Sequence, residues 1–163
     1  MMKNNEIFNK YDLLMNPALG FISIASFLEG YGVKKTAPFI LCFFAIPLSF
    51  QKDIRLVSLS SRSIQSFYSK LFMNQKNRLA LLHKTVKSFR DLTFKSILIG
   101  VSLGFFDLDT KNGTVMIKRK IKIPEKYSDN LTIQDISKSS KKIGIFFSES
   151  DIYSIFKQMN TEA

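Results

Sequence analysis

Residues 93–118 read TFKSILIGVSLGFFDLDTKNGTVMIK, and this stretch decides the fold class. Its first half predicts a helix that Thr93 caps and Gly104 ends. Its second half contains two short strand patterns, and the turn between them ends in Asn112-Gly113, a pair that favours the positive φ values of tight hairpin turns. Helix, strand, turn and strand in this order form the closing half of a winged helix. We therefore predict a winged-helix-like segment at about 75–123.

The residues before this stretch predict helices. Asn16 can cap a helix whose first position is Pro17, where the missing N–H is tolerated, and Gly30-Tyr31-Gly32 ends that helix. The same arrangement of cap and proline predicts a second helix over about 36–50. Because this second helix is apolar all round, we expect it at the centre of the fold.

Further helices complete the expected domain. A helix over about 63–72 is followed by one over about 75–90, which Asn74 would cap. After the hairpin, apolar periodicity predicts a C-terminal helical pair at about 132–159. The chain is thus expected to be a single helical domain over 1–163, mainly α with a small β-hairpin.

The net charge of +11 predicts an acidic partner, and the excess lies in the middle of the chain. Residues 51–126 carry sixteen Lys or Arg against five acids, whereas the parts on either side are close to neutral. Nineteen of the 24 basic residues are Lys, and base-edge reading favours the Arg fork, so non-specific phosphate attraction is the better interpretation. An A- and T-rich coding sequence would also enrich Lys, Asn, Ile and Phe.

The candidate nucleic-acid contacts lie in two parts of this basic middle. Three are on the wetter side of the predicted helix over 75–90, and four are in an extension of the second hairpin strand to about 123. In that extension Lys and Ile alternate, and lysines on one side of a strand serve phosphate binding and protection of a sheet edge equally well. The candidates are Lys84, Lys87, Arg90, Lys118, Arg119, Lys120 and Lys122.

No reactive groups are spaced for nucleophilic catalysis or for cofactor binding. Cys42 lies inside an apolar run, which predicts a buried and inert thiol. His83 has no Cys, His or acid spaced to share a metal ion. We therefore expect no enzyme activity, no cofactor and no small-molecule substrate.

The closest acids in the sequence are Asp107 and Asp109, one residue apart on the first hairpin strand. A metal-dependent nuclease would need further carboxylates around its Mg²⁺, and Asp53 and Asp91 are the acids that folding could add. Polar positions beside a turn explain the pair better, so the nuclease is the weakest of the hypotheses.

Neither export nor a membrane anchor is expected. The N-terminal residues lack the apolar core and cleavage site of a secretory signal. The longest apolar stretch, over 37–50, is shorter than the roughly 20 residues that a spanning helix needs. These features predict a cytoplasmic protein without a membrane partner.

The helix before the hairpin has an unusual composition for a DNA-reading module. A recognition helix presents polar and basic side chains to the major groove, whereas this one is largely apolar. We interpret it as buried in the core or in a protein partner, with protein contact as the function of the winged-helix-like segment. The candidate docking residues are Ile97, Ile99, Val101 and Leu103.

The chain resembles the middle components of bacterial three-component ABC systems, over roughly residues 12–159. The resemblance rests on the order and spacing of motifs and on no catalytic signature. It implies a small subunit encoded beside an ABC-type ATPase of the SMC or Rad50-like kind and an effector, in anti-phage systems similar to Lamassu. The motifs are Asn16-Pro17-Ala18, Gly30-Tyr31-Gly32, Ile46-Pro47-Leu48, Lys52, Ser60-Ser61, the Thr93 helix with its hairpin, Gly144-Ile145-Phe146-Phe147 and Asp151-Ile152-Tyr153-Ser154-Ile155-Phe156.

Three functions therefore compete. The leading one is a non-catalytic adaptor that joins the ATPase and the effector, with DNA held in part by the basic middle of this chain. The second is a stand-alone winged-helix DNA-binding regulator, and the third is the nuclease. The Lys-rich stretch over 118–122 is more basic than the resemblance implies, which keeps direct DNA contact open.

Overall fold

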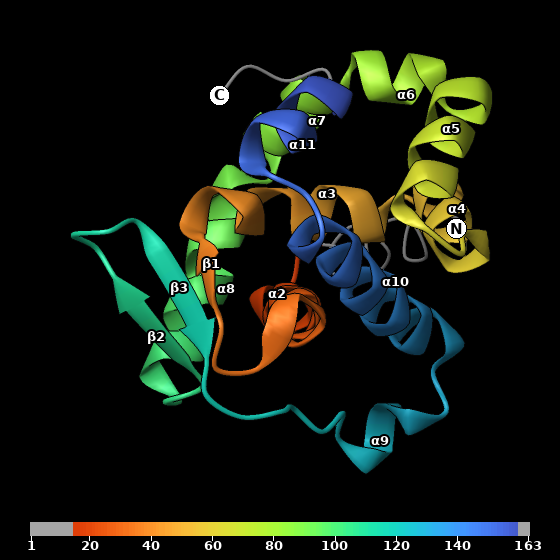
Figure 1. Ribbon diagram of the computed structural model, residues 1–163. Helices are drawn as coiled ribbons and strands as arrows, with labels where there is room; N and C mark the ends of the chain where they lie inside the picture. Colours follow the sequence, from red (N-terminus) through yellow and green to blue (C-terminus); the bar gives the residue numbers. More distant parts are fainter. Residues whose placement is uncertain (1–14, 160–163) are drawn as a thin grey trace.

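Helix α2 (Pro17–Gly32) is the central element of the computed structural model, which describes residues 15–159. Its start is as predicted: Pro17 occupies the first turn, and the amide of Ala18 donates to Asn16 Oδ1 at 2.8 Å. Figure 1 shows α2 almost end-on, with α8 (Arg90–Ser102) on one side and α10 (Leu131–Ser148) on the other. The predicted fold class, mainly α with a small β element, is confirmed.

The second predicted helix is partly wrong, because its first residues form a strand. β1 (Thr36–Pro38) pairs antiparallel with β3 (Thr114–Ile117), and a short 3₁₀ helix, η1 (Phe39–Leu41), leads into α3 (Cys42–Phe50). Pairing with a distant strand supplies backbone hydrogen bonds that override the local cap-and-proline signal. The predicted central position of α3 is confirmed, since nearly all of its side chains are buried.

The hairpin is confirmed, and it belongs to a three-stranded sheet. β2 (Phe106–Asp109) and β3 are antiparallel, and the strand order is β1-β3-β2. Gly113 has a φ of 63°, as the turn requires. The winged-helix likeness of this part remains a prediction.

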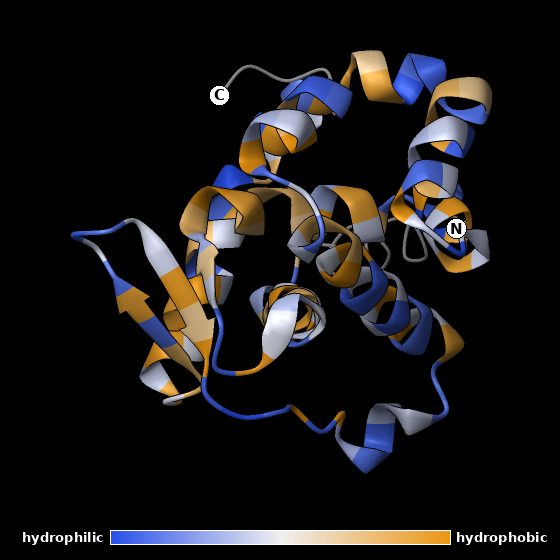
Figure 2. Cartoon of the chain, viewed as in Figure 1, coloured by the Kyte–Doolittle hydropathy of each residue, from blue (hydrophilic) through white to orange (hydrophobic). Residues whose placement is uncertain are grey.

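The expected extension of β3 to 123 is wrong. The strand ends at Ile117, and the next residues cross toward α2 and α10 as an extended segment, where the amide of Ile121 donates to Glu29 Oε1 at 2.5 Å. Because no strand pairs with this segment, its lysines do not guard a sheet edge. Figure 2 shows this segment as largely hydrophilic, in contrast to the hydrophobic α3.

The middle of the chain is more broken than its periodicity indicates. α4 (Lys52–Ser60) precedes α5 (Ile64–Asn74), which Ser63 caps. The single helix predicted over 75–90 is instead α6 (Lys76–Ala80) and α7 (Leu82–Ser88).

Two residues with ψ close to zero separate these helices. Leu81 (ψ 2°) ends α6, and Phe89 (ψ 3°) ends α7. α8 then begins at Arg90, so Thr93 is not its cap but donates from within the helix to the carbonyl of Phe89 at 2.9 Å. Burial of Leu82 and packing of Phe89 against Phe50 explain why the chain bends at these points.

The C-terminal pair of helices is present, preceded by one extra turn. α9 (Glu125–Ser128) leads into the long α10, and α11 (Ile152–Gln158) follows. Asn130 caps α10 and Asp151 caps α11 through their side-chain oxygens. No helix among residues 15–159 is both long enough and apolar enough to cross a bilayer.

The α2–α10 crossing is made of small residues. A Cβ atom added at Gly30 would overlap the carbonyl of Lys141, and one added at Gly144 would overlap the carbonyl of Phe27. Buried serine hydroxyls bond across the same crossing, with Ser23 Oγ 3.2 Å from Ser140 Oγ. The two helices therefore touch at backbone level and leave no space between them.

Candidate protein-docking surface

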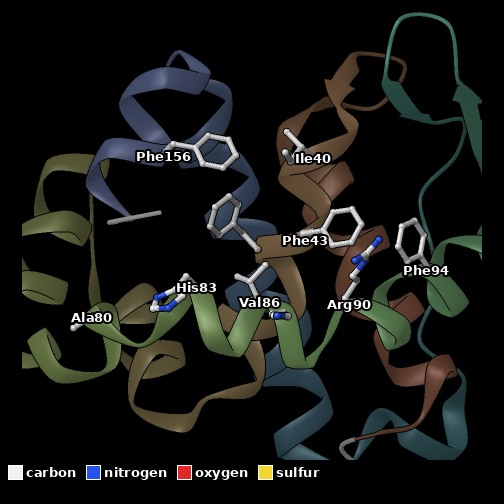
Figure 3. A pocket seen from close by; sticks show the side chains of 10 residues that line it. Ile40, Phe43, Ala80, His83, Val86, Arg90, Phe94 and Phe156 are labelled. Carbon is white, nitrogen blue, oxygen red and sulfur yellow. The ribbon is translucent and has the colours of Figure 1, made fainter. Parts of the chain in front are cut away.

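A groove of about 840 Å³ opens between α7, α11 and the η1–α3 segment, and α8 closes one end of it. Figure 3 shows Ile40 and Phe156 on one side and the α7 residues on the other, with Phe43 and Phe94 at the end. We call this the aromatic groove. Its lining is Ile40, Phe43, Phe44, Ala80, His83, Val86, Lys87, Arg90, Phe94 and Phe156.

One wall of the aromatic groove is formed by α7 and the start of α8. His83, Val86 and Lys87 follow the i, i+3, i+4 spacing that places side chains on one side of α7, and Arg90 lies beyond the bend at Phe89, at the first position of α8. Leu82 holds α7 against the core, because its side chain is completely buried. The wall is therefore apolar at its centre and positively charged along its length.

The other wall is a cluster of phenylalanine rings. Phe43 makes edge-to-face contacts with Phe39 (centroids 5.5 Å apart) and with Phe94 (5.2 Å). Phe44 packs in the same manner on Phe156, at 5.4 Å. Such contacts fix the orientation of the rings, so the groove has a preformed wall.

The rim of the groove carries positive charge. Within residues 15–159, Lys84, Lys87 and Arg90 form no ion pair, and no acid lines the groove. The Arg90 guanidinium lies over the ring of Phe94, 5.7 Å from its centroid. Arg78 on α6 differs, because it forms an ion pair with Asp53 at 2.6 Å.

An exposed apolar stripe on α8 extends from the groove. Phe94, Leu98 and Val101 follow the i, i+4, i+7 spacing and are 39%, 63% and 39% exposed. Phe94 belongs to both the stripe and the groove. The two features therefore form one continuous surface, which we call the docking surface.

The predicted docking residues meet this surface only in part. Val101 lies in the stripe and Leu103 is exposed just beyond the end of α8, whereas Ile99 is half-buried. Ile97 packs in the core with 2% exposure, so no partner can reach it. The prediction missed Phe94 and Leu98, although their spacing from Val101 could have indicated them.

The predicted nucleic-acid contacts are exposed but fall into two separate places. Lys84, Lys87 and Arg90 lie on α7 and at the start of α8, beside the aromatic groove. The other four lie in the segment after β3, at the end of the molecule opposite α7 (Figure 1). Arg119 in this segment stacks on Phe105, 4.2 Å from its centroid. The structure does not bring the two groups together into one basic face.

The acids of the nuclease hypothesis are also apart. Asp109 accepts hydrogen bonds from the backbone amides of Lys111 and Asn112 and from the Asn112 side chain, and these bonds lower its pKa. Asp53 is paired with Arg78 on another part of the molecule. In the described part of the chain, no three His, Cys, Asp or Glu side chains are grouped to hold a metal ion.

The lone cysteine and the lone histidine are in different surroundings. Cys42 is buried, and burial raises the pKa of its thiol to about 12. A thiol of this pKa is not a nucleophile at neutral pH. His83 is exposed at the aromatic groove.

Comparison with known proteins identifies the family. The family model described as "ABC-three component (ABC-3C) system Middle Component 3" matches residues 4–162. No curated protein and no solved structure matches the chain. Since the match covers nearly the whole sequence, this chain belongs to the Middle Component 3 family of ABC-three component systems.

Proposed function

We propose that this chain is a non-catalytic adaptor in a bacterial anti-phage complex, where it joins an SMC- or Rad50-like ABC ATPase to an effector in the cytoplasm. Membership of a middle-component family supports an adaptor role, because a middle component acts within a multi-component system. The observation that carries the proposal is the docking surface. Exposed apolar side chains that line a groove and continue along a helix are typical of protein interaction sites.

Co-expression with the two neighbouring genes of the system tests the adaptor role. We expect a tagged copy of this chain to retain both neighbours through size-exclusion chromatography. If the ATPase and the effector bind each other equally well without this chain, and neither binds it, the adaptor role is wrong. A catalytic assay of the isolated chain is expected to show no turnover.

We further propose that the segment over 118–122 holds DNA once the complex is assembled. Its four cations are exposed and lie away from the aromatic groove, so DNA and a protein bound in the groove would not compete for them. The triple variant Lys118→Ala, Lys120→Ala, Lys122→Ala should weaken DNA binding of the complex and reduce its salt slope by about 3, because each lysine that binds a phosphate contributes about 1 to the slope. An unchanged salt slope would reject DNA binding by this segment.

The stand-alone DNA-binding regulator fits the structure less well. The helix before the hairpin, α8, exposes Phe94, Leu98 and Val101, and such a stripe offers no hydrogen bonds to base edges. Sequence-specific binding of one DNA site by the isolated chain would support the regulator over the adaptor.

A further inference from the structure

The aromatic groove combines apolar walls with positive charges at its rim. This combination suits an occupant that carries a row of apolar side chains with acids beside them. The two walls of the groove present Phe43 and Val86, which would contact apolar anchors. Its rim carries Lys87 and Arg90, and their charges have no acidic partner within residues 15–159. Two cations at the rim of an apolar groove would attract an acidic occupant from a distance.

The walls of the groove indicate the conformation of the occupant. The lining residues lie on helices, whose backbone N–H and C=O groups are bonded within the helices themselves. An extended segment would find no strand edge for its own backbone groups. A helix satisfies its backbone internally and needs only side-chain contacts, as in helix-in-groove recognition.

A single-stranded nucleic acid fits the groove less well, although cations and aromatic rings are both present. Bases stack on free ring faces. Here Phe43 and Phe94 meet edge to face, and the Arg90 guanidinium already lies over the ring of Phe94. The rings thus form an apolar wall rather than a series of stacking platforms.

We propose that the aromatic groove binds an acidic amphipathic helix of a partner protein within the complex. The apolar side of that helix packs between α7 and the η1–α3 segment, and its carboxylates face Lys87 and Arg90. This inference rests on the proposed adaptor function, since it names the kind of segment through which one partner is held.

Charge reversal tests the rim. The double variant Lys87→Glu, Arg90→Glu changes two exposed side chains; a glutamate suits the dipole at the start of α8 and opposes it at the end of α7, and each effect is small at an exposed position, so we expect folding to be retained. We expect its affinity for the co-purified partners to fall at least about tenfold at 0.1 M salt, and the loss to shrink as salt rises. The matched control Lys118→Glu, Lys120→Glu carries the same charge change at the other end of the molecule and should alter protein binding less than about twofold.

A second variant tests the apolar wall. Ile40 is 43% exposed at the groove, and Ile40→Asp places a carboxylate where an apolar anchor would pack. We expect a loss of at least about tenfold that shrinks with salt less than the loss of the rim variant does, because desolvation of the new carboxylate adds to its repulsion of the acidic helix. Circular dichroism melting of the variants checks that each is folded.

Photo-crosslinking identifies the occupant. A benzoylphenylalanine placed at position 87 should capture a peptide of the ATPase or the effector that is acidic and has apolar residues at i, i+3 or i+4, and i+7. Capture of a basic or extended peptide, of DNA, or of a second copy of this chain would overturn the inference.

The two levels of the proposal fail differently. If the wild-type complex forms and neither groove variant weakens it, the groove inference is wrong and the adaptor function stands. If the wild-type chain retains no partner, the adaptor function itself is wrong.

Discussion

The α2–α10 crossing and the aromatic groove are both places where helices face each other, and they differ in the size of the side chains. At the crossing, Gly30, Gly144 and several serines let two backbones touch. At the groove, phenylalanines of α3, α8 and α11 contact one another edge to face, and about 840 Å³ stays open beside α7. Small residues close the crossing to any ligand, whereas rigid rings create a space that a partner can enter.

The largest difference is expected in thiol reactivity, between the open groove and the closed core beside it. Ile40 and Cys42 lie two positions apart, yet Ile40 is 43% exposed at the groove and Cys42 is fully buried. In the variant Ile40→Cys, the new thiol should react with Ellman's reagent at least about 1,000-fold faster than Cys42, because Cys42 requires opening of the core, which costs roughly 5 kcal/mol or more. Equal rates for the two thiols would show that the core around α3 is open.

The closed crossing should not tolerate a side chain on α10. Gly144→Leu would force the leucine against the carbonyl of Phe27 and separate the helices, lowering the free energy of unfolding by about 3 kcal/mol or more. Urea denaturation measures the change. Lys138→Ala changes an exposed side chain of the same helix; it is the control and should change stability by less than about 0.5 kcal/mol.

At the open groove, removal of a side chain should weaken partner binding more than it lowers stability. Phe94→Ala removes a ring that is 39% exposed, so stability should fall by only about 1–2 kcal/mol. Binding of the partner proteins, followed by biolayer interferometry, should weaken about tenfold or more, since exposed aromatic residues often dominate interfaces. A variant that loses stability but binds normally would assign Phe94 to the fold alone.

The smallest expected effect is a pH dependence at the groove wall. Asp151 caps α11, which carries Phe156, and hydrogen bonds from the Ser154 amide and hydroxyl lower the Asp151 pKa. Its contribution to stability is therefore complete above the unfolded carboxyl pKa of about 4 and is lost as pH falls through the lower folded value. Asp151→Asn keeps a cap that does not titrate, so its melting temperature should fall less than that of the wild type between pH 5 and pH 2. Identical pH profiles would show that the cap does not contribute.

The sequence predicted those elements that are determined by capping or turn residues within a few positions of each other. Asn16-Pro17 gave the start of α2, and Asn112-Gly113 gave the hairpin turn. β1 carries the same kind of cap-and-proline signal as α2, but its pairing with Met116 and its neighbours decides its structure. A signal that distant is not present in any local window of the sequence.

The candidate site was predictable only in fragments. The cations at Lys87 and Arg90 were identified as exposed, and Val101 as apolar and available. The groove itself was not predicted, because four separate parts of the chain supply its lining and because the helix over 75–90 breaks at Leu81. Ile97 shows the converse error: an apolar helix has both a core side and an exposed side, and composition alone does not separate them.

The register of the sheet has a consequence for synthesis on the ribosome. Thr36 pairs with Met116 of β3. β1 can therefore pair with β3 only after α2 through α8 and the hairpin have left the exit tunnel. Until then the backbone groups of β1 that will bond to β3 have no strand to pair with, and α2 lacks the α10 surface that covers it. Co-translational folding of this chain is therefore completed late, by the residues that follow the hairpin.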